Sequence, residues 1–109
     1  MANIYKVLGQ SIPAATTNTT LYTVPSATSA VCSTLAICNQ GPVSTNIRVA
    51  IRPAGATLAT SQYIIYDAFV SMNDTLFFTL GVSLATTDVV TVYAGTATVS
   101  FSLFGSEIS

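Results

Sequence analysis

Side chains that could carry acid–base or nucleophilic chemistry are scarce in this sequence of 109 residues. Histidine is absent, which removes the commonest general base, the usual catalytic triads and most zinc sites. Lys6 is the only lysine and lies near the N-terminus, so a Ser–Lys pair of nucleophile and base is poorly supported. We therefore predict no catalytic, cofactor-binding or metal-binding residues, and no enzyme activity.

The two cysteines, Cys32 and Cys38, fall in one predicted strand and, by simple alternation, on the same face of it. At about 3.3 Å per residue their Cα atoms would lie roughly 20 Å apart. A disulfide needs Cα atoms within about 7 Å of each other. The spacing therefore predicts free, small, buried or half-buried thiols in a reducing compartment.

Three of the four acidic residues, Asp67, Asp74 and Asp88, lie at the edges of predicted strands. Aspartate at such positions commonly accepts hydrogen bonds from nearby backbone amides in turns. The acids show neither the spacing of a calcium-binding loop nor a sign that two carboxylates meet, as glycoside hydrolysis requires. We predict turn-forming roles for them and no metal site.

Arg48 and Arg52 lie four residues apart in one predicted strand, which places them on the same face, about 13 Å apart. Each guanidinium could grip a carboxylate of a neighbouring subunit, or could merely keep an outer sheet face hydrated. Tyr63 and Tyr66 join them as candidate interface residues, because tyrosine rings suit a protein interface or stacking on a sugar.

Charged residues make up only 6% of the chain, where about 25% is usual for a soluble domain. The 17 threonines and 12 serines must supply most of the surface polarity. Near-neutral proteins tend to associate, and interface cores are poor in charge, so the composition predicts extensive protein contacts. A monomer with an unusually neutral surface is the alternative.

The same composition argues against several partners. Three basic residues are too few for binding nucleic acid through its phosphates. No apolar run exceeds four residues, so a transmembrane helix is excluded and no membrane partner is expected. The first residues lack the basic start and apolar stretch of a secretory signal, which predicts synthesis and retention in a cytoplasm.

Alternating apolar and polar residues between turn signals predict strands at short intervals. Eight candidates span 4–8, 21–24, 30–39, 47–52, 62–66, 75–80, 88–93 and 98–104. The best helical window, 54–60, is short and contains glycine. We therefore predict one all-β domain over 1–109, an antiparallel β-sandwich or jelly-roll-like fold. Its predicted core includes Val31, Leu35, Ile37, Val49, Ile51, Val99, Phe101 and Leu103.

Segments along almost the whole chain resemble small virion structural proteins of tailed bacteriophages, particularly those of cyanobacterial hosts. These segments are 6–10 (KVLGQ), 21–25 (LYTVP), 48–55 (RVAIRPAG), 88–90 (DVV) and 101–108 (FSLFGSEI). The resemblance implies a structural component of the virion, assembled in the bacterial cytoplasm. Its partners would be other copies of itself and major capsid or tail proteins.

Capsid decoration, in which the protein cements the shell, is the first expectation for a compact domain without fibrous repeats. A neck, tail, baseplate or fibre-associated component is the alternative within the virion. A carbohydrate-binding module that contacts the host surface is a second alternative, and it would need exposed tyrosines arranged as a flat platform. The absence of tryptophan argues against that alternative.

Overall fold

The computed structural model describes residues 3–109, which form eight strands and two short 3-10 turns. Each predicted strand has a counterpart, and within the described residues no helix is long and apolar enough to cross a membrane. The elements are β1 (Asn3–Ser11), β2 (Thr19–Thr23), β3 (Ser29–Asn39), β4 (Thr45–Arg52), η1 (Pro53–Gly55), η2 (Thr60–Gln62), β5 (Tyr63–Val70), β6 (Thr75–Leu84), β7 (Val89–Ala94) and β8 (Val99–Ile108).

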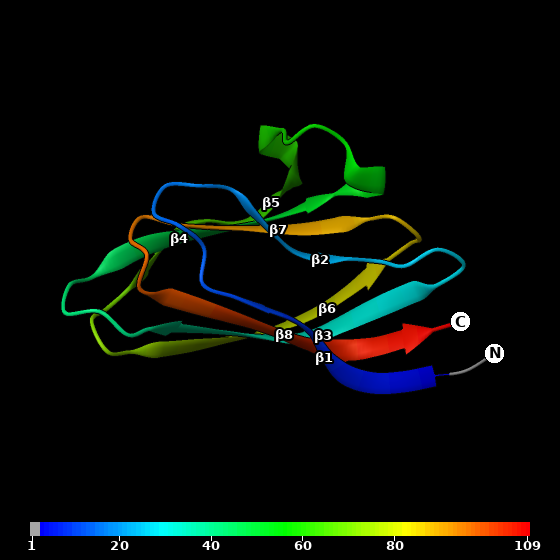
Figure 1. Cartoon of the computed structure of the whole chain (residues 1–109), viewed down its shortest axis with the longest axis horizontal. Coiled ribbons are helices and arrows are strands. Elements are labelled where there is room, and N and C mark those ends of the chain that lie inside the picture. The colour runs from blue at the N-terminus through cyan, green and yellow to red at the C-terminus, as the bar shows by residue number, and fades with distance from the viewer. Residues whose placement is uncertain (1–2) are drawn as a thin grey trace.

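The strands form two four-stranded antiparallel sheets that pack face to face (Figure 1). Sheet A has the order β1-β8-β3-β6, and sheet B has the order β2-β7-β4-β5. The pairs β1·β8, β2·β7, β3·β6 and β4·β5 make the chain one long hairpin, whose tip is the β4–β5 connection. Rolled into two sheets, this hairpin is an eight-stranded jelly roll, so the predicted fold class is confirmed.

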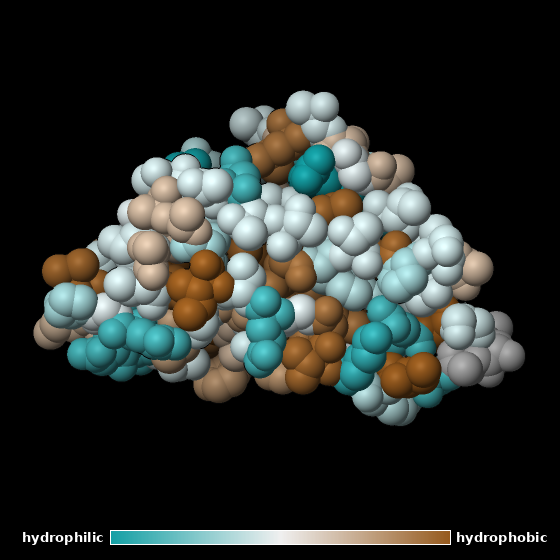
Figure 2. Space-filling model, viewed as in Figure 1, coloured by the Kyte–Doolittle hydropathy of each residue, from teal (hydrophilic) through white to brown (hydrophobic). Residues whose placement is uncertain are grey.

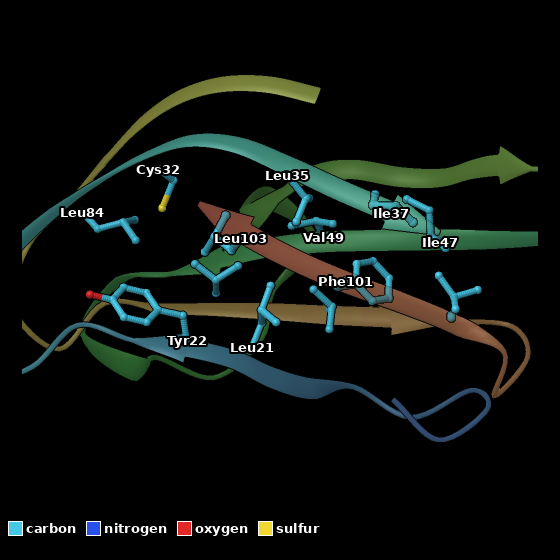
Figure 3. Close-up of a cluster of buried hydrophobic side chains, with 14 of the residues drawn as sticks. Leu21, Tyr22, Cys32, Leu35, Ile37, Ile47, Val49, Leu84, Phe101 and Leu103 are labelled. Carbon is cyan, nitrogen blue, oxygen red and sulfur yellow. The ribbon is translucent and has the colours of Figure 1, made fainter. Parts of the chain in front are cut away.

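The core fills the space between the inner faces of the two sheets (Figure 3). Aliphatic side chains and one phenylalanine from both sheets interdigitate there, as expected for stacked sheets. Of the predicted core, Ile51 is half-buried and packs against the cluster. Six others are fully buried, namely Leu35, Ile37, Val49, Val99, Phe101 and Leu103.

A bulge in β3 overturns part of the face assignment made from alternation. Cys32 pairs with Gly105 and Thr34 with Phe104, which leaves Ser33 unopposed and shifts the phase of the strand. Cys32 is therefore buried in the core, whereas Val31 and Cys38 are half-buried on the outer face. Placing Val31 in the core and both cysteines on one face was wrong. Both thiols are free.

All four edge strands are interrupted in the same way. The register shifts at Leu8 in β1, at Leu21 in β2, at 66–67 in β5 and at 80–81 in β6. Bulges twist an edge strand and break the row of free backbone groups that another strand could pair with. Contacts with other chains are therefore expected at the sheet faces rather than at the sheet edges.

One end of the sandwich is held together by the fully buried side chain of Asn39, at the end of β3. Its Nδ2 donates to the carbonyl oxygens of Val43 at 2.9 Å, and of Val70 and Ser71 at 3.3 Å each. Its Oδ1 accepts hydrogen bonds from the amide of Gly41 and the hydroxyl of Thr98, both at 3.0 Å. This single amide therefore joins three connections between strands. Asn39 was not among the residues predicted from the sequence to have a special role.

Candidate functional site

On the outer face of sheet B, Arg48 lies between two tyrosine rings. Its guanidinium carbon is 4.4 Å from the ring centre of Tyr66 and 4.5 Å from that of Tyr93. Its Nε donates to Oδ1 of Asp67 at 2.6 Å, and its Nη2 donates to Oδ2 at 3.3 Å. Cation–π contacts on both sides and a two-point ion pair at the end hold this side chain in place.

A bulge in β5 builds this arrangement. Ile47 pairs with Ala68 and Val49 pairs with Ile65, so Tyr66 and Asp67 both lie opposite Arg48. The bulge brings one ring and one carboxylate to the same guanidinium, with Asp67 in the left-handed region at φ 54°. The prediction that Asp67 lies at a strand edge and accepts hydrogen bonds from backbone amides is therefore wrong.

Hydrogen bonds to its neighbours stabilise the charged form of Asp67. The guanidinium of Arg48 and the side-chain amide of Asn46, which donates at 2.8 Å, hold the pKa of this carboxyl below its usual value. The same ion pair raises the pKa of Arg48 further above its usual value. Both groups therefore stay charged and paired across the ordinary pH range.

Three of the four candidate interface residues come together in this cluster. The rings of Tyr63 and Tyr66 meet edge to face, with centres 5.0 Å apart and planes at 77°. Arg52 points elsewhere, because its Nε donates to the carbonyl oxygen of Ala56 at 2.7 Å and its Nη2 donates to that of Gly55 at 3.1 Å. The guanidinium groups of Arg48 and Arg52 thus both bind partners within the chain. The sequence had predicted either a carboxylate of a neighbouring subunit or water as their partner.

The other charged side chains are also used internally. Asp74 accepts from the amide of Thr75 at 2.9 Å, and Asp88 accepts from those of Ala54 and Ala85 at 2.8 and 2.9 Å. The turn-forming role predicted for these two acids is confirmed. Together with Lys6 and Glu107, described next, all seven charged side chains have a partner within the chain.

At the opposite end of the sandwich from Asn39, Glu107 bridges the two sheets. Its Oε1 lies 2.9 Å from Nζ of Lys6, and its Oε2 accepts a hydrogen bond from the hydroxyl of Tyr22 at 2.5 Å. These two hydrogen bonds lower the pKa of Glu107. Burial, and then the bond to Glu107, raise the pKa of Tyr22 well above its usual value, while burial raises that of Cys32 to about 11.

These shifts predict a stability plateau that falls at both ends of the pH range. Because folding lowers the pKa of Glu107, its stabilising contacts are fully present above about pH 4.3 and are lost as the pH falls. Because folding raises the pKa of Tyr22, the unfolded chain releases the phenol proton first, and stability falls from about pH 10 upward. We expect Tyr22→Phe to flatten both declines when urea unfolding is measured across this range.

Tyr5→Phe is the matched control, because the ring of Tyr5 is 80% exposed. It should leave the pH profile of the wild type unchanged. The alkaline decline contributed by Cys32 is common to all three proteins, so the difference between the profiles reports on Tyr22. Superimposable profiles for the wild type and Tyr22→Phe would show that the bond to Glu107 contributes nothing to stability.

Large apolar side chains, by contrast, are exposed on both outer sheet faces. On β5 of sheet B, Tyr66 is 59% exposed and Phe69 is 67% exposed. On sheet A, Tyr5 in β1 is 80% exposed and Phe77 in β6 is 71% exposed. Figure 2 shows apolar side chains that reach the surface among pale, weakly polar residues. Large aromatic side chains therefore lie on the protein surface together with the few charged ones.

The outer face of sheet A is made of cross-strand rows without any charged side chain. Residues that pair directly across strands point to the same face. The rows are Tyr5, Ser106, Val31 and Ser83; then Val7, Phe104, Thr34 and Thr79; then Gln10, Ser102, Ala36 and Phe77; then Ser100, Cys38 and Thr75. Simple alternation could not reveal this face, because the bulges in β1, β3 and β6 change which residues share it.

Within residues 3–109, no group of three or more His, Cys, Asp or Glu side chains is placed to hold a metal ion. Comparison of the chain with protein-family models, with curated proteins and with solved structures finds no match. The two sheet faces are therefore the features of the molecule that bear on its function.

Proposed function

We propose that this domain is a non-enzymatic structural subunit of a bacteriophage particle, where it decorates the capsid and cements the shell through protein contacts. The observation that carries the proposal is that every charged side chain has an ion-pair or hydrogen-bond partner within the chain, while aromatic rings are exposed on both sheet faces. Surfaces poor in charge and rich in aromatic side chains suit lasting protein contacts. Other copies of the chain and a major virion protein are the proposed partners.

Three further features support a place in the virion, with assembly in the bacterial cytoplasm. The jelly roll is an architecture that viral capsid domains use, although a fold alone does not determine a function. The five segments described above resemble virion structural proteins along almost the whole chain. Interrupted edge strands also suit a protein that is present in many copies at high local concentration, because they prevent strands from pairing without limit.

The β5 surface of sheet B is the proposed contact with the major virion protein. Tyr66 and Phe69 supply exposed aromatic anchors of the kind that dominate binding energy. Arg48 and Tyr63 hold the ring of Tyr66 in position, so little side-chain freedom is lost on binding. Arg52 is not part of this surface, because it holds the 53–56 segment, which contacts the start of β7.

The same surface would serve a neck, tail, baseplate or fibre-associated component, and these placements remain the alternatives within the particle. The carbohydrate-binding alternative has less support. A sugar-binding platform needs aromatic rings that lie flat and side by side, whereas the rings of Tyr63 and Tyr66 are inclined by 77°. The geometry therefore favours a protein partner.

We expect Tyr66→Ala to weaken incorporation into particles by about 30-fold, which corresponds to the roughly 2 kcal/mol lost when a binding anchor is truncated. The measurement compares the amount of each variant in density-purified particles at a series of added protein concentrations. Thermal unfolding of the same variant should show a loss of only about 1 kcal/mol, from the cation–π contact with Arg48.

Tyr66→Phe is the control, because it keeps the ring over Arg48 and removes only the hydroxyl group. It should be incorporated as the wild type is. A chain that never copurifies with particles would overturn the proposed function. Equal incorporation of Tyr66→Ala and the wild type would instead exclude the β5 surface as the contact.

A further inference from the structure

The outer face of sheet A carries a hollow at one side and a projecting ring at the other. The hollow has a volume of about 610 Å³ and lies over β1, β8 and β3. Gly105, which has no side chain, leaves room for it. Its apolar lining is formed by Tyr5, Val7, Val31 and Phe104, and its polar lining by Lys6, Ser33 and Ser106. Across the sheet on the edge strand β6, the ring of Phe77 is 71% exposed.

We propose that a second copy of this chain packs on this face, outer face against outer face, with Phe77 of each copy in the hollow of the other. A two-fold contact is self-complementary: if a residue of the first copy fits a site on the second, the same residue of the second copy fits the same site on the first. A hollow and an unmatched ring on one face meet that requirement. This contact would join neighbouring copies of the subunit in the particle. Only its occurrence in a phage particle rests on the proposed function.

The spacing of the strands and rows makes the exchange geometrically feasible. Neighbouring strands lie about 4.8 Å apart and residues on one face about 6.6 Å apart along a strand, so Phe77 lies roughly 10 Å from the hollow in each direction. A two-fold axis midway between them passes near Thr34 and Ala36 of β3, whose small side chains allow close approach. In a face-to-face dimer this axis lies in the plane of the interface, perpendicular to the line that joins Phe77 to the hollow. Because the offsets along and across the strands are equal, the axis makes about 45° with the strands. The strands of the two copies therefore cross at about 90°, a known mode of sheet packing.

Charge and area favour a second copy over another partner. The fifteen side chains of the rows carry no charge. Lys6 is the one charged residue that lines the hollow, and it is paired with Glu107 of its own chain, so two copies meet with little like-charge repulsion. The face spans roughly 19 by 30 Å, a size comparable to the interfaces that bury about 800 Å² of accessible surface on each partner. The bulge in each edge strand disfavours the competing contact, in which strands pair edge to edge.

The test is sedimentation equilibrium of the purified protein over a wide range of concentrations, with two matched variants. Phe77→Asp and Phe69→Asp place the same charge at similarly exposed phenylalanines on edge strands, but on opposite sheets. We expect the wild type and Phe69→Asp to form dimers, and Phe77→Asp to raise the dimer Kd by about 30-fold or more. Thermal unfolding confirms that each variant is folded.

An independent measurement uses Ala36→Cys in a Cys38→Ser background. A thiol-specific crosslinker that spans about 10 Å should join its two copies, because residue 36 lies near the axis and packed sheets are about 10 Å apart. A wild type that stays monomeric at millimolar concentration would overturn the inference. So would a dimer that Phe69→Asp weakens and Phe77→Asp does not. A monomer that is still incorporated into particles would overturn the self-contact alone, whereas a dimer that never enters particles would overturn only the proposed function.

Discussion

Replacing Asn39 by alanine is expected to lower the free energy of unfolding by about 3 kcal/mol or more. The substitution removes one buried amide and leaves the carbonyl oxygens of Val70 and Ser71, and the amide of Gly41, without that partner. Unsatisfied buried polar groups cost about 1–3 kcal/mol each when water cannot reach them. Urea unfolding at neutral pH, followed by circular dichroism, measures the loss.

Two variants test whether the hydrogen bonds cause this loss. Gln40→Ala removes the neighbouring exposed side chain, which makes one 3.3 Å bond to Ser100, and should change stability by no more than about 0.5 kcal/mol. Asn39→Asp keeps the size and the accepting oxygen but places a carboxylate among carbonyl groups, so it should be about as harmful as alanine at neutral pH. A harmless Asn39→Asp would show that the site depends on packing alone.

The positions of the strands were predictable from sequence because alternation is a local property. In β4 the apolar residues Ile47 and Val49 face the core while Arg48 points outward, as the pattern predicted. The pairing of strands is not local, since it depends on contacts between segments such as β1 and β8 at opposite ends of the chain. The sequence therefore predicted two sheets without predicting which strands lie beside each other in them.

The candidate site was predictable only in part, because its geometry depends on bulges. Arg48, Tyr63 and Tyr66 could be selected by residue type and face, and the structure gathers them. Asp67 reaches Arg48 only because β5 is bulged there. A signal for this bulge was available in the run of residues 63–70, where four large apolar residues precede an aspartate and break the alternation.

Gly9 lies inside β1, although it was predicted to end this strand. The first strand was predicted to end at Leu8, because a glycine follows and glycine commonly interrupts strands. The structure continues β1 to Ser11, and Gly9 lies inside it directly after the register shift. The glycine is there because β1 of sheet A passes close to Leu21 of β2 in sheet B.

Gly9→Ala is accordingly expected to destabilise the domain by about 3 kcal/mol, near the upper end of the usual cost of overpacking. A Cβ atom at residue 9 would clash with the carbonyl oxygen of Leu21, a backbone atom that can move only if the edges of the two sheets separate. Gly81→Ala is the matched control in the edge strand β6, where a Cβ would meet nothing within 4 Å. The control should cost only about 1–2 kcal/mol, from the left-handed backbone at φ 64°. Equal losses for the two variants in urea unfolding would show that β1 and β2 are not in close contact at Gly9.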